Sequence, residues 1–472
     1  MAKMFLFDSV QKEKVLFESQ EENKVKMYVC GPTVYDDAHL GHARSAIVFD
    51  LLHRVLKANG YEVTFVKNFT DIDDKIIKKM GDSGKSLEEI TTHYIQSYKA
   101  DMEALNILPS TIEPKATESL EAMVGLIDTL LENKRAYKLE DGVYLETAQD
   151  AHYGDISHRI SDDASISRIE TNNQKKDQKD FALWKFNTDG VSYHTHFGEG
   201  RPGWHCECSA MIDKHLANHE LPYAIDIHGG GADLLFPHHE NEASQTRLAY
   251  GQELSKYWVH NGFVNINGEK MSKSLGNSFF LKDALKEYSG EVIRFYMLTT
   301  YYRADFGFNT EDLEASKKRL DKLYRLKKRV YDVVKNDTLK ALSYKENILE
   351  ALNDDMNTSK AFATIDEFVN FANDKLDSNP KDKNLKSQIV ELFDFISYIL
   401  GIGYQNPYNY FQFGISEDEK NKIKKLIEER TEAKKEKNFV LSDAIRDQLT
   451  NMGIRIMDTV NDTKWEKLNK EN

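Results

Sequence analysis

Two short segments of the chain carry side chains suited to binding phosphate. The first is His39-Leu40-Gly41-His42, which stands at the head of a predicted helix. Backbone N–H groups and the helix dipole favour an anion at such a position, and imidazole N–H groups can donate hydrogen bonds to phosphate oxygens. Gly41 would let an adenine approach the backbone closely, because it has no side chain. By itself, so short a match is more often a pair of ordinary surface histidines.

The second segment is Lys270-Met271-Ser272-Lys273-Ser274, which is followed by Gly276. Lysines on a loop suit a polyphosphate whose charge shifts during a reaction. The alternative is a solvated charged turn, which is common, and the five residues alone do not decide between the two. The histidine and lysine segments in one chain are a far more specific observation than either segment alone.

A third group of residues has the composition of a metal site. Pro237 suits the first turn of a helix, so His238 and Glu242, four positions apart, would face the same way. Cys30 and Cys208 would complete a set of two sulfurs, one nitrogen and one oxygen, which lies within the ligand repertoire of zinc. The alternative is a polar helix start and two buried cysteines.

The chain contains only three cysteines, Cys30, Cys206 and Cys208. An odd and sparse count argues against a framework of disulfides. Cys206 and Cys208 are two positions apart, which would put both thiols on one face of a strand or on a turn. Cytosolic cysteines of this kind are metal ligands, nucleophiles or plain core residues.

The bulk composition bounds the class of protein. The 472 residues include 40% hydrophobic and 30% charged residues, enough for sizeable cores and a solvated surface, and the net charge is −14. So acidic a chain is not a generic nucleic-acid coat, and any RNA contact must use locally concentrated basic residues. We find no apolar run near the roughly 18 residues of a membrane span and no signal-peptide pattern, so we expect a cytoplasmic protein.

The residues from 26 to 67 predict a β–α–β unit. Residues 26–30 resemble a buried strand, residues 47–56 carry apolar side chains at helical spacing, and residues 62–66 predict the next strand. Gly60 suits the end of the helix. Such a unit implies a parallel sheet, in which ligands bind at the carboxyl ends of the strands. Cys30 and the turn after it therefore lie at an expected site.

The later segments extend this pattern. Residues 224–227 predict a strand that runs into Gly229, Gly230 and Gly231, so the first and third parts of the chain would be two halves of one nucleotide-binding fold. Residues 136–200, between the halves, show little periodicity. From about residue 310 the chain is strongly helical, and the last block, from about residue 415, is helical and rich in lysine.

The histidine and lysine segments together resemble the two signature motifs of the class I aminoacyl-tRNA synthetases. Within that class, four longer blocks at residues 28–36, 68–75, 203–209 and 226–242 look like those of the cysteinyl-tRNA synthetases. The resemblance continues through residues 354–358 and 430–465, so it covers nearly the whole chain. It implies an α/β fold with a Rossmann-type parallel-sheet catalytic domain, an insertion, a helical bundle and a small C-terminal domain.

On this resemblance we expect six regions. They are the first half of the Rossmann domain (1–125), a connective insertion (126–200), the second half (201–265), a region around the lysine motif that contacts the tRNA stem (266–312), a helical bundle (313–412) and an anticodon-recognition domain (413–472).

The resemblance also implies an activity and its site residues. The family activates L-cysteine with ATP and transfers it to tRNA-Cys, with one Zn²⁺ per chain and Mg²⁺ bound with ATP. The implied roles are as follows: zinc ligands Cys30, Cys208, His238 and Glu242; catalytic residues His39, His42, Lys270 and Lys273; ATP-binding residues His39, Gly41, His42, Gly229, Gly230, Gly231, Asp233 and Lys273; and substrate-binding residues Gly31, Thr70, Trp204 and His228. In the family the position of Cys206 is usually aliphatic, so we interpret Cys206 as a core residue.

RNA contacts are expected in two basic segments. Between Lys317 and Arg329, eight of the thirteen residues are basic, which on a helix would form a positive stripe for phosphates, or else a solvated face. The resemblance assigns the tail, with its basic segment at residues 420–437, to anticodon recognition.

Aromatic residues between Tyr404 and Phe413 would either stack on bases or seal a domain junction, and we favour the junction. We expect a monomer without membrane contact.

Three other functions would fit parts of the pattern. A cysteine ligase that joins cysteine to an amino sugar would share the catalytic domain but would lack the tail. A regulatory RNA-binding relative without activity would have lost a lysine of the 270–274 motif or a zinc ligand, and all are present. A zinc hydrolase built on His238, His239 and Glu240 would leave the lysine motif unexplained.

Overall fold

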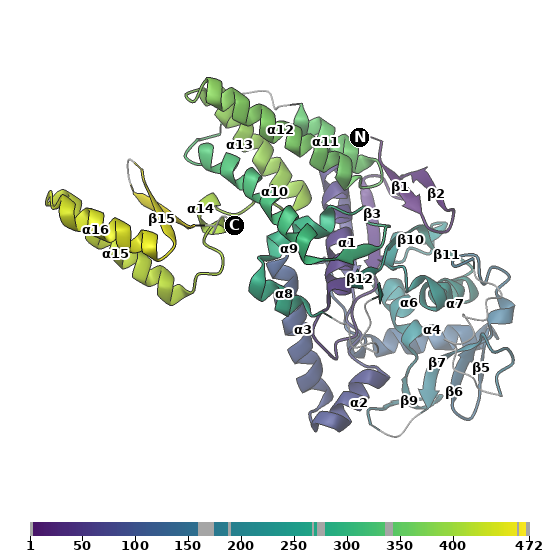
Figure 1. The fold of residues 1–472 in the computed structure, drawn as a ribbon. Coiled ribbons are helices and arrows are strands. Elements are labelled where there is room, and N and C mark those ends of the chain that lie inside the picture. Colours follow the sequence, from purple (N-terminus) through teal and green to yellow (C-terminus); the bar gives the residue numbers. More distant parts are fainter. Residues whose placement is uncertain are drawn as a thin grey trace. The chain divides into compact units, whose positions relative to one another are not determined.

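A computed structural model describes residues 3–158, 174–186, 190–266, 269–270, 279–335, 343–459 and 462–468 (Figure 1). For residues 266, 269 and 270 only the backbone is described. The chain divides into two compact units. The first comprises residues 1–282, 297–310 and 346–363, and the second comprises residues 283–296, 311–345 and 364–472.

The centre of the first unit is a parallel sheet of four strands in the order β11-β10-β3-β4. The strands are β3 (Lys24–Val29), β4 (Glu62–Lys67), β10 (Tyr223–Gly231) and β11 (Glu253–Asn261). The predicted β–α–β unit is confirmed, because helix α1 (Leu40–Ala58) connects β3 to the parallel β4. The predicted joining of two halves is also confirmed, because β10 pairs with both β3 and β11.

Local sequence explains these elements. Strand β3 buries four apolar side chains, as expected for a parallel strand covered on both faces, namely Val25, Met27, Tyr28 and Val29. Helix α1 begins at its N-cap His39 and ends at Asn59. Gly60 follows with φ 90°, a left-handed conformation that glycine adopts without strain. The end of β3 and the start of α1 therefore fix the connecting segment that carries Cys30 and His39.

An antiparallel sheet of five strands, in the order β5-β6-β7-β9-β8, lies between the halves in sequence (Figure 1). Its strands are β5 (Ala136–Lys138), β6 (Gly142–Leu145), β7 (Phe181–Phe186), β8 (Tyr193–Thr195) and β9 (Gly198–Pro202). Helix α4 (Leu120–Glu132) shares an apolar core with this sheet, and Trp184 is fully buried in it. The sequence of this region shows little periodicity because most of these strands are too short to display one.

The remaining elements that lie wholly in the first unit are β1 (Phe5–Asp8), β2 (Glu13–Leu16), α2 (Asp74–Ser83), α3 (Leu87–Ala104), α6 (Trp204–His215), α7 (Glu240–Tyr250), β12 (Val264–Ile266), β13 (Glu269–Lys270) and β14 (Phe306–Phe308). Short helical turns cover residues 117–119, 147–149 and 235–239. Strand β12 pairs with β13 and β14. Helix α6 packs against α4 and α7, so α6 connects the insertion to the parallel sheet.

Most described elements from residue 281 onward are helices, and the predicted helical character of the chain after residue 310 is confirmed. The helices are α8 (Leu281–Glu287), α9 (Gly290–Leu298), α10 (Thr310–Arg329), α11 (Tyr344–Asn353), α12 (Thr358–Ser378), α13 (Lys383–Leu400), α14 (Pro407–Tyr410), α15 (Glu417–Lys435) and α16 (Phe439–Asn451), followed by the hairpin β15 (Ile454–Asp458) and β16 (Thr463–Lys467). The tail has an apolar core of its own, formed by Ile423, Ile427, Ile445, Leu449 and Ile454. Among the described helices, none combines the length and apolar character that crossing a bilayer requires.

Helix α10 contains the predicted basic stripe, but ion pairs neutralise much of it. Three of its basic side chains pair with acids that come from other helices or from the tail: Arg319 with Asp366, Arg329 with Asp377 and Lys328 with Glu466. Two more are engaged locally or with the backbone: Lys317 pairs with Asp321, and Lys327 donates to the carbonyls of Gly403 and Gln405. The stripe available for phosphates is therefore reduced mainly to Lys318, Lys322 and Arg325.

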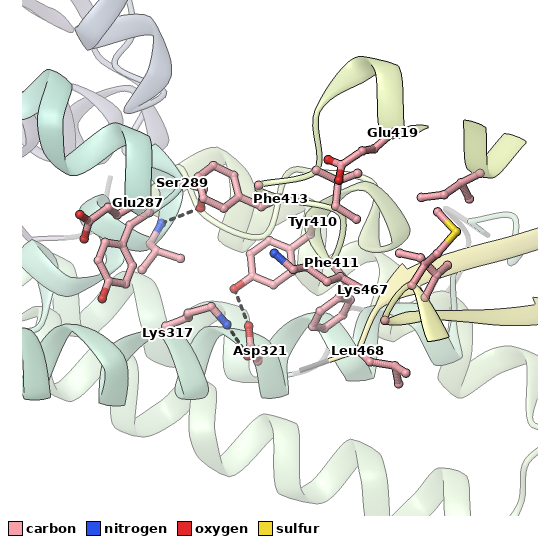
Figure 2. A pocket seen from close by; sticks show the side chains of 18 of the residues that line it. Glu287, Ser289, Lys317, Asp321, Tyr410, Phe411, Phe413, Glu419, Lys467 and Leu468 are labelled. Atoms are coloured by element: carbon pink, nitrogen blue, oxygen red, sulfur yellow. Dashed lines mark hydrogen bonds and ion pairs between the residues drawn. The ribbon is translucent and has the colours of Figure 1, made fainter. Parts of the chain in front are cut away.

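In the aromatic segment before the tail, Tyr410 supports the predicted junction, whereas Tyr404 and Phe413 are each 40% exposed. Tyr410 is buried, and its ring stacks on Tyr324 with 3.8 Å between centroids. Its hydroxyl donates to Asp321 at 2.8 Å, an interaction that Figure 2 shows at the wall of a cavity of 1330 Å³ within the second unit. A side chain held by both stacking and a buried hydrogen bond is not free to stack on a base.

Candidate metal centre and active site

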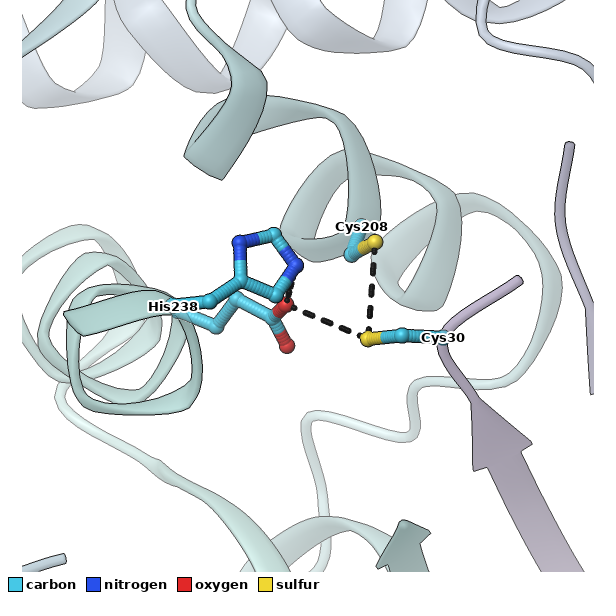
Figure 3. Close-up of side chains that lie close together, drawn as sticks. Cys30, Cys208 and His238 are labelled. Atoms are coloured by element: carbon cyan, nitrogen blue, oxygen red, sulfur yellow. Dashed lines mark hydrogen bonds and ion pairs between the residues drawn. The ribbon is translucent and has the colours of Figure 1, made fainter. Parts of the chain in front are cut away.

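Four potential metal ligands from three segments meet at the carboxyl end of β3 (Figure 3). Cys30 follows the last residue of β3, Cys208 lies on α6, and Glu242 lies on α7. His238 lies in the turn that leads into α7. The ligand atoms of all four residues lie within 4.8 Å of one another.

The distances fit a tetrahedral ion with thiolate ligands. Metal–sulfur bonds of about 2.3 Å would separate two sulfurs of a tetrahedron by about 3.8 Å. The Sγ atoms of Cys30 and Cys208 are 3.8 Å apart, and Cys30 Sγ lies 3.5 Å from Glu242 Oε1. His238 Nε2 and Glu242 Oε1 are closer, at 2.6 Å, the length of a direct hydrogen bond. The donor set and the separation of its two sulfurs therefore suit zinc.

The segment that carries Cys206 and Cys208 is a helix, so the prediction of a strand or turn was wrong. On α6 two residues two positions apart project about 200° apart, whereas on a strand they would share a face. The structure separates the thiols accordingly. Cys206 lies in the apolar core beneath the insertion, and Cys208 lies in the core that borders Cys30. The interpretation of Cys206 as a core residue is confirmed.

The prediction that Pro237 lies in the first turn of a helix agrees with the structure. Phe236 has an extended backbone (φ −138°, ψ 134°) that interrupts the helical turn at residues 235–239, and the stretch from Pro237 continues into α7, which begins at Glu240. His238 and Glu242 therefore face each other and form a buried ion pair.

The two thiols differ in acidity. Burial is the main cause that raises the pKa of Cys30 well above its usual value. The hydrogen bond from Cys30 is the main cause that lowers the pKa of the Cys208 thiol, to about 6. The hydrogen bond that Cys30 donates therefore favours the thiolate form of Cys208, which is the form that binds metals.

A layer of histidines surrounds these ligands. His228, on β10, contacts Glu242 Oε2 through Nε2 and the carbonyl of Tyr28 through Nδ1. His239 was not predicted as a site residue, although it follows His238 directly. Its Nε2 lies 3.4 Å from Cys30 Sγ and its Nδ1 lies 2.8 Å from His260 Nε2. His239 and His260 therefore help to orient the groups around Cys30.

The other predicted pocket residues lie near the same place. Trp204 stacks on His238 with 4.2 Å between ring centroids, and both line a cavity of 500 Å³ together with Asp233. Thr70 is buried and donates to Glu207 Oε2 at 3.0 Å. Sequence reasoning gave Glu207 no role, although it lies between the two cysteines of α6. Burial raises the pKa of Glu207 well above its usual value.

The predicted ligand-binding glycines have packing reasons of their own. A Cβ at Gly31 would lie 1.5 Å from the carbonyl oxygen of Asn68, and Gly31 N–H donates to the Asn68 side chain at 2.8 Å. A Cβ at Gly229 would lie 2.2 Å from the ring of Phe49 on α1. The neighbours Gly230 and Gly231 likewise have close contacts, so this end of β10 admits no side chain without rearrangement.

The histidine motif forms the N-terminus of α1 in an unusual way. The Nδ1 atom of His39 accepts from the backbone N–H groups of Gly41 and His42, and Nδ1 of His42 accepts from the N–H of His39. The rings stack with 3.7 Å between centroids. We had expected these backbone N–H groups to be open to phosphate. In the structure they donate to the histidine rings instead. A neutral ring that accepts at Nδ1 carries its proton on Nε2, from which it can donate.

Of the lysine motif, the structure describes only a part. The backbone of Lys270 pairs with Asn265 in the two-stranded contact of β12 and β13. Lys273 and the other residues from 271 to 278 lie outside the described residues. The predicted roles of Lys270 and Lys273 therefore stay predictions.

Comparisons with known proteins identify the family of the chain. Residues 16–318 match the family described as tRNA synthetases class I (C) catalytic domain, and residues 347–405 match the DALR domain. The cysteine--tRNA ligase of Aliarcobacter butzleri is 64% identical over 469 residues, which are 99% of this chain and 100% of that protein. The chain belongs to the cysteine--tRNA ligase family. The ligase of Nitratiruptor sp. is 60% identical over 98% of this chain and 100% of that protein.

Solved structures of other synthetases share the fold of this family member. Mycobacterium tuberculosis methionyl-tRNA synthetase in complex with methionyl-adenylate has a TM-score of 0.60 and 14% identity, over 80% of this chain and 92% of that one. Agrobacterium radiobacter LeuRS has a TM-score of 0.61 and 12% identity, over 84% of this chain and 86% of that one. At such identities the likeness concerns the fold alone, which is the predicted α/β class with a helical region after it.

Proposed function

We propose that the protein activates L-cysteine with ATP and transfers it to the 3′-terminal adenosine of tRNA-Cys. The observation that carries the proposal is the convergence of Cys30, Cys208, His238 and Glu242 at the end of β3, in a chain of the cysteine--tRNA ligase family. In the same proposal the protein acts as a monomer in the cytoplasm.

The proposed metal is one zinc ion per chain, held by those four residues. Bound there, zinc supplies a soft Lewis acid that favours a thiolate sulfur over the hydroxyl of serine. The stack of Trp204 on His238 keeps that imidazole in a fixed plane, and Glu242 is held by both His228 and His238. Rigid groups of this kind recognise a small substrate at little entropic cost.

The proposed chemistry begins with attack of the cysteine carboxylate on the α-phosphorus of ATP. An oxygen–phosphorus bond forms, the bond to the bridging oxygen breaks, and pyrophosphate leaves with the electron pair. His39 and His42 donate from Nε2 to the triphosphate, while Lys270 and Lys273, with Mg²⁺, balance the charge of the leaving group. Gly41, Gly229, Gly230, Gly231 and Asp233 are proposed to border the adenosine or the substrate amine, and Gly31, Thr70, Trp204 and His228 the cysteine.

In the second step the ribose hydroxyl of the terminal adenosine attacks the carbonyl carbon of the adenylate. An ester bond forms, the bond between the carbonyl carbon and the phosphate oxygen breaks, and AMP leaves with the electron pair while its phosphate takes up the hydroxyl proton. The two steps are tested by cysteine-dependent exchange of pyrophosphate into ATP and then by charging of tRNA-Cys. Serine serves as the control substrate in both assays. A protein that exchanges with serine as readily as with cysteine, or with neither, would contradict the proposal.

We expect replacement of Lys273 by alanine to slow adenylate formation by about a hundredfold, because a charge that acts on the departing pyrophosphate matters mainly in the transition state. The affinity for cysteine should change little. Pre-steady-state formation of the adenylate separates the two quantities. A large rise in the cysteine dissociation constant with an unchanged chemical rate would show that Lys273 has a different role.

A further inference from the structure

An ion pair outside the metal-binding residues joins the turn before α1 to the start of α8. Lys282 Nζ contacts Asp37 Oδ2, and the Asp37 side chain is only 12% exposed. The other carboxylate oxygen of Asp37 accepts a hydrogen bond from Ser97 Oγ, on α3, at 2.8 Å. One carboxylate thus joins three segments that are far apart in sequence, all within the first unit.

Beside this ion pair, backbone hydrogen bonds connect the same two segments. His39 and Phe280 form an antiparallel bridge. The N–H of Leu281 donates to the carbonyl of Ala38 at 2.8 Å, and the N–H of Leu40 donates to the carbonyl of Phe279 at 3.3 Å. The position of His39 at the N-terminus of α1 is therefore tied to the segment 279–281, which follows the lysine motif in the chain.

The local balance of charge makes Lys282 important to this arrangement. Asp101 lies one helical turn after Ser97 on α3, is buried, and has an Oδ2 atom without a hydrogen-bond partner. Burial, and then the charge of Asp37, raise the pKa of Asp101 to about 6, whereas Lys282 opposes that rise. Without Lys282, the charge of Asp37 would act on Asp101 without the lysine that opposes it.

We propose that Asp37 and Lys282 are positioning residues that act on the ATP side of the reaction. Their ion pair holds the segment 279–281 against His39, and this contact keeps the histidine motif in the geometry that adenylate formation requires. This inference rests on the proposed function. Neither residue belongs to the group of metal ligands at the end of β3. The ion pair should therefore affect the ATP side of the reaction and leave cysteine recognition unchanged.

The first experiment compares Lys282→Met with a matched variant on the same helix. Lys286 pairs with Asp283 at 2.7 Å within α8 and is 71% exposed, so Lys286→Met removes a similar lysine–aspartate pair without touching the histidine motif. Pyrophosphate exchange gives kcat and the KM values for ATP and cysteine. We expect kcat/KM for ATP to fall about tenfold or more in Lys282→Met, because small displacements of a catalytic group are costly. The KM for cysteine should stay within about twofold, and Lys282→Arg should restore most of the loss.

The second experiment is a double-mutant cycle with Asp37→Asn. If the two side chains act as one pair, the double variant should be no slower than the slower single variant. Three results would overturn the inference: additive losses, Lys282→Met kinetics equal to those of Lys286→Met, or an equal loss on the cysteine side. Absence of exchange in the unmodified protein would instead contradict the proposed function, so the two failures can be told apart.

Discussion

Replacement of Cys208 by serine should release the metal and reduce cysteine-dependent pyrophosphate exchange by more than about a hundredfold. Loss of a group that merely supports a ligand costs about 10- to 100-fold in metal affinity, so loss of a ligand should cost more. Serine offers a hard, neutral hydroxyl where a thiolate lies 3.8 Å from its partner sulfur. Zinc content of the purified protein is the readout, and it does not depend on activity.

Cys206→Ser is the matched control, because Cys206 lies two positions away on α6 and is fully buried. Its side chain belongs to the apolar core beneath the insertion rather than to the group of ligands. A hydroxyl there should lower the free energy of unfolding by about 1–3 kcal/mol, while one zinc per chain is retained. Zinc retained in Cys208→Ser and lost in Cys206→Ser would show that the assignment of the thiols is inverted.

Removal of the tail after Gly414 should abolish efficient charging of tRNA-Cys while cysteine activation continues. Every residue proposed to contact ATP, cysteine or zinc precedes residue 277, and the tail has its own apolar core. The basic segment at residues 420–437 and the following helix and hairpin suit contacts with phosphates and with unstacked bases. We expect exchange within a few-fold of the full chain and a fall in charging by orders of magnitude, mainly through weaker tRNA binding.

The melting temperature of the truncated protein supplies the control. The tail is bound to the helical region by the ion pair of Lys328 with Glu466 and by a hydrogen bond from Gln412 to the carbonyl of Trp465. Losing these contacts should lower the melting temperature modestly. If exchange and charging fell together, the tail would act only as a support for the helices. If charging stayed complete, the tail would have no part in tRNA recognition.

The frame of the first unit could be predicted from local patterns in the chain. Alternation of a strand, an apolar helical stripe and a second strand between residues 26 and 67 is a local pattern, and the connection rules for parallel strands then bring Cys30 to a ligand-binding edge. The spacing of His238 and Glu242 was also enough to predict that their side chains meet, because residues four apart on helical backbone face the same way.

The spacing of the two thiols of α6 could not distinguish them: the resemblance to the family favoured Cys208, and the folded chain supplies the physical reason. Residues 204–209 have no apolar periodicity, and a separation of two residues is the repeat of a strand, so spacing alone favoured the wrong element. The short strands of the insertion were missed for a related reason. Their stability comes from pairing with segments distant in sequence, such as β6 with β7, and not from local preference.

The charged side chains show most clearly what local sequence patterns could not predict. The lysines and arginines of α10 predict a positive stripe, yet their partners Asp366, Asp377 and Glu466 come from far along the chain. The pairing of Asp37 with Lys282 likewise joins residues that no local pattern relates. Hydrogen bonds and ion pairs depend on atoms within a few ångströms of one another, so only the folded chain decides which of these charges remain available for a ligand.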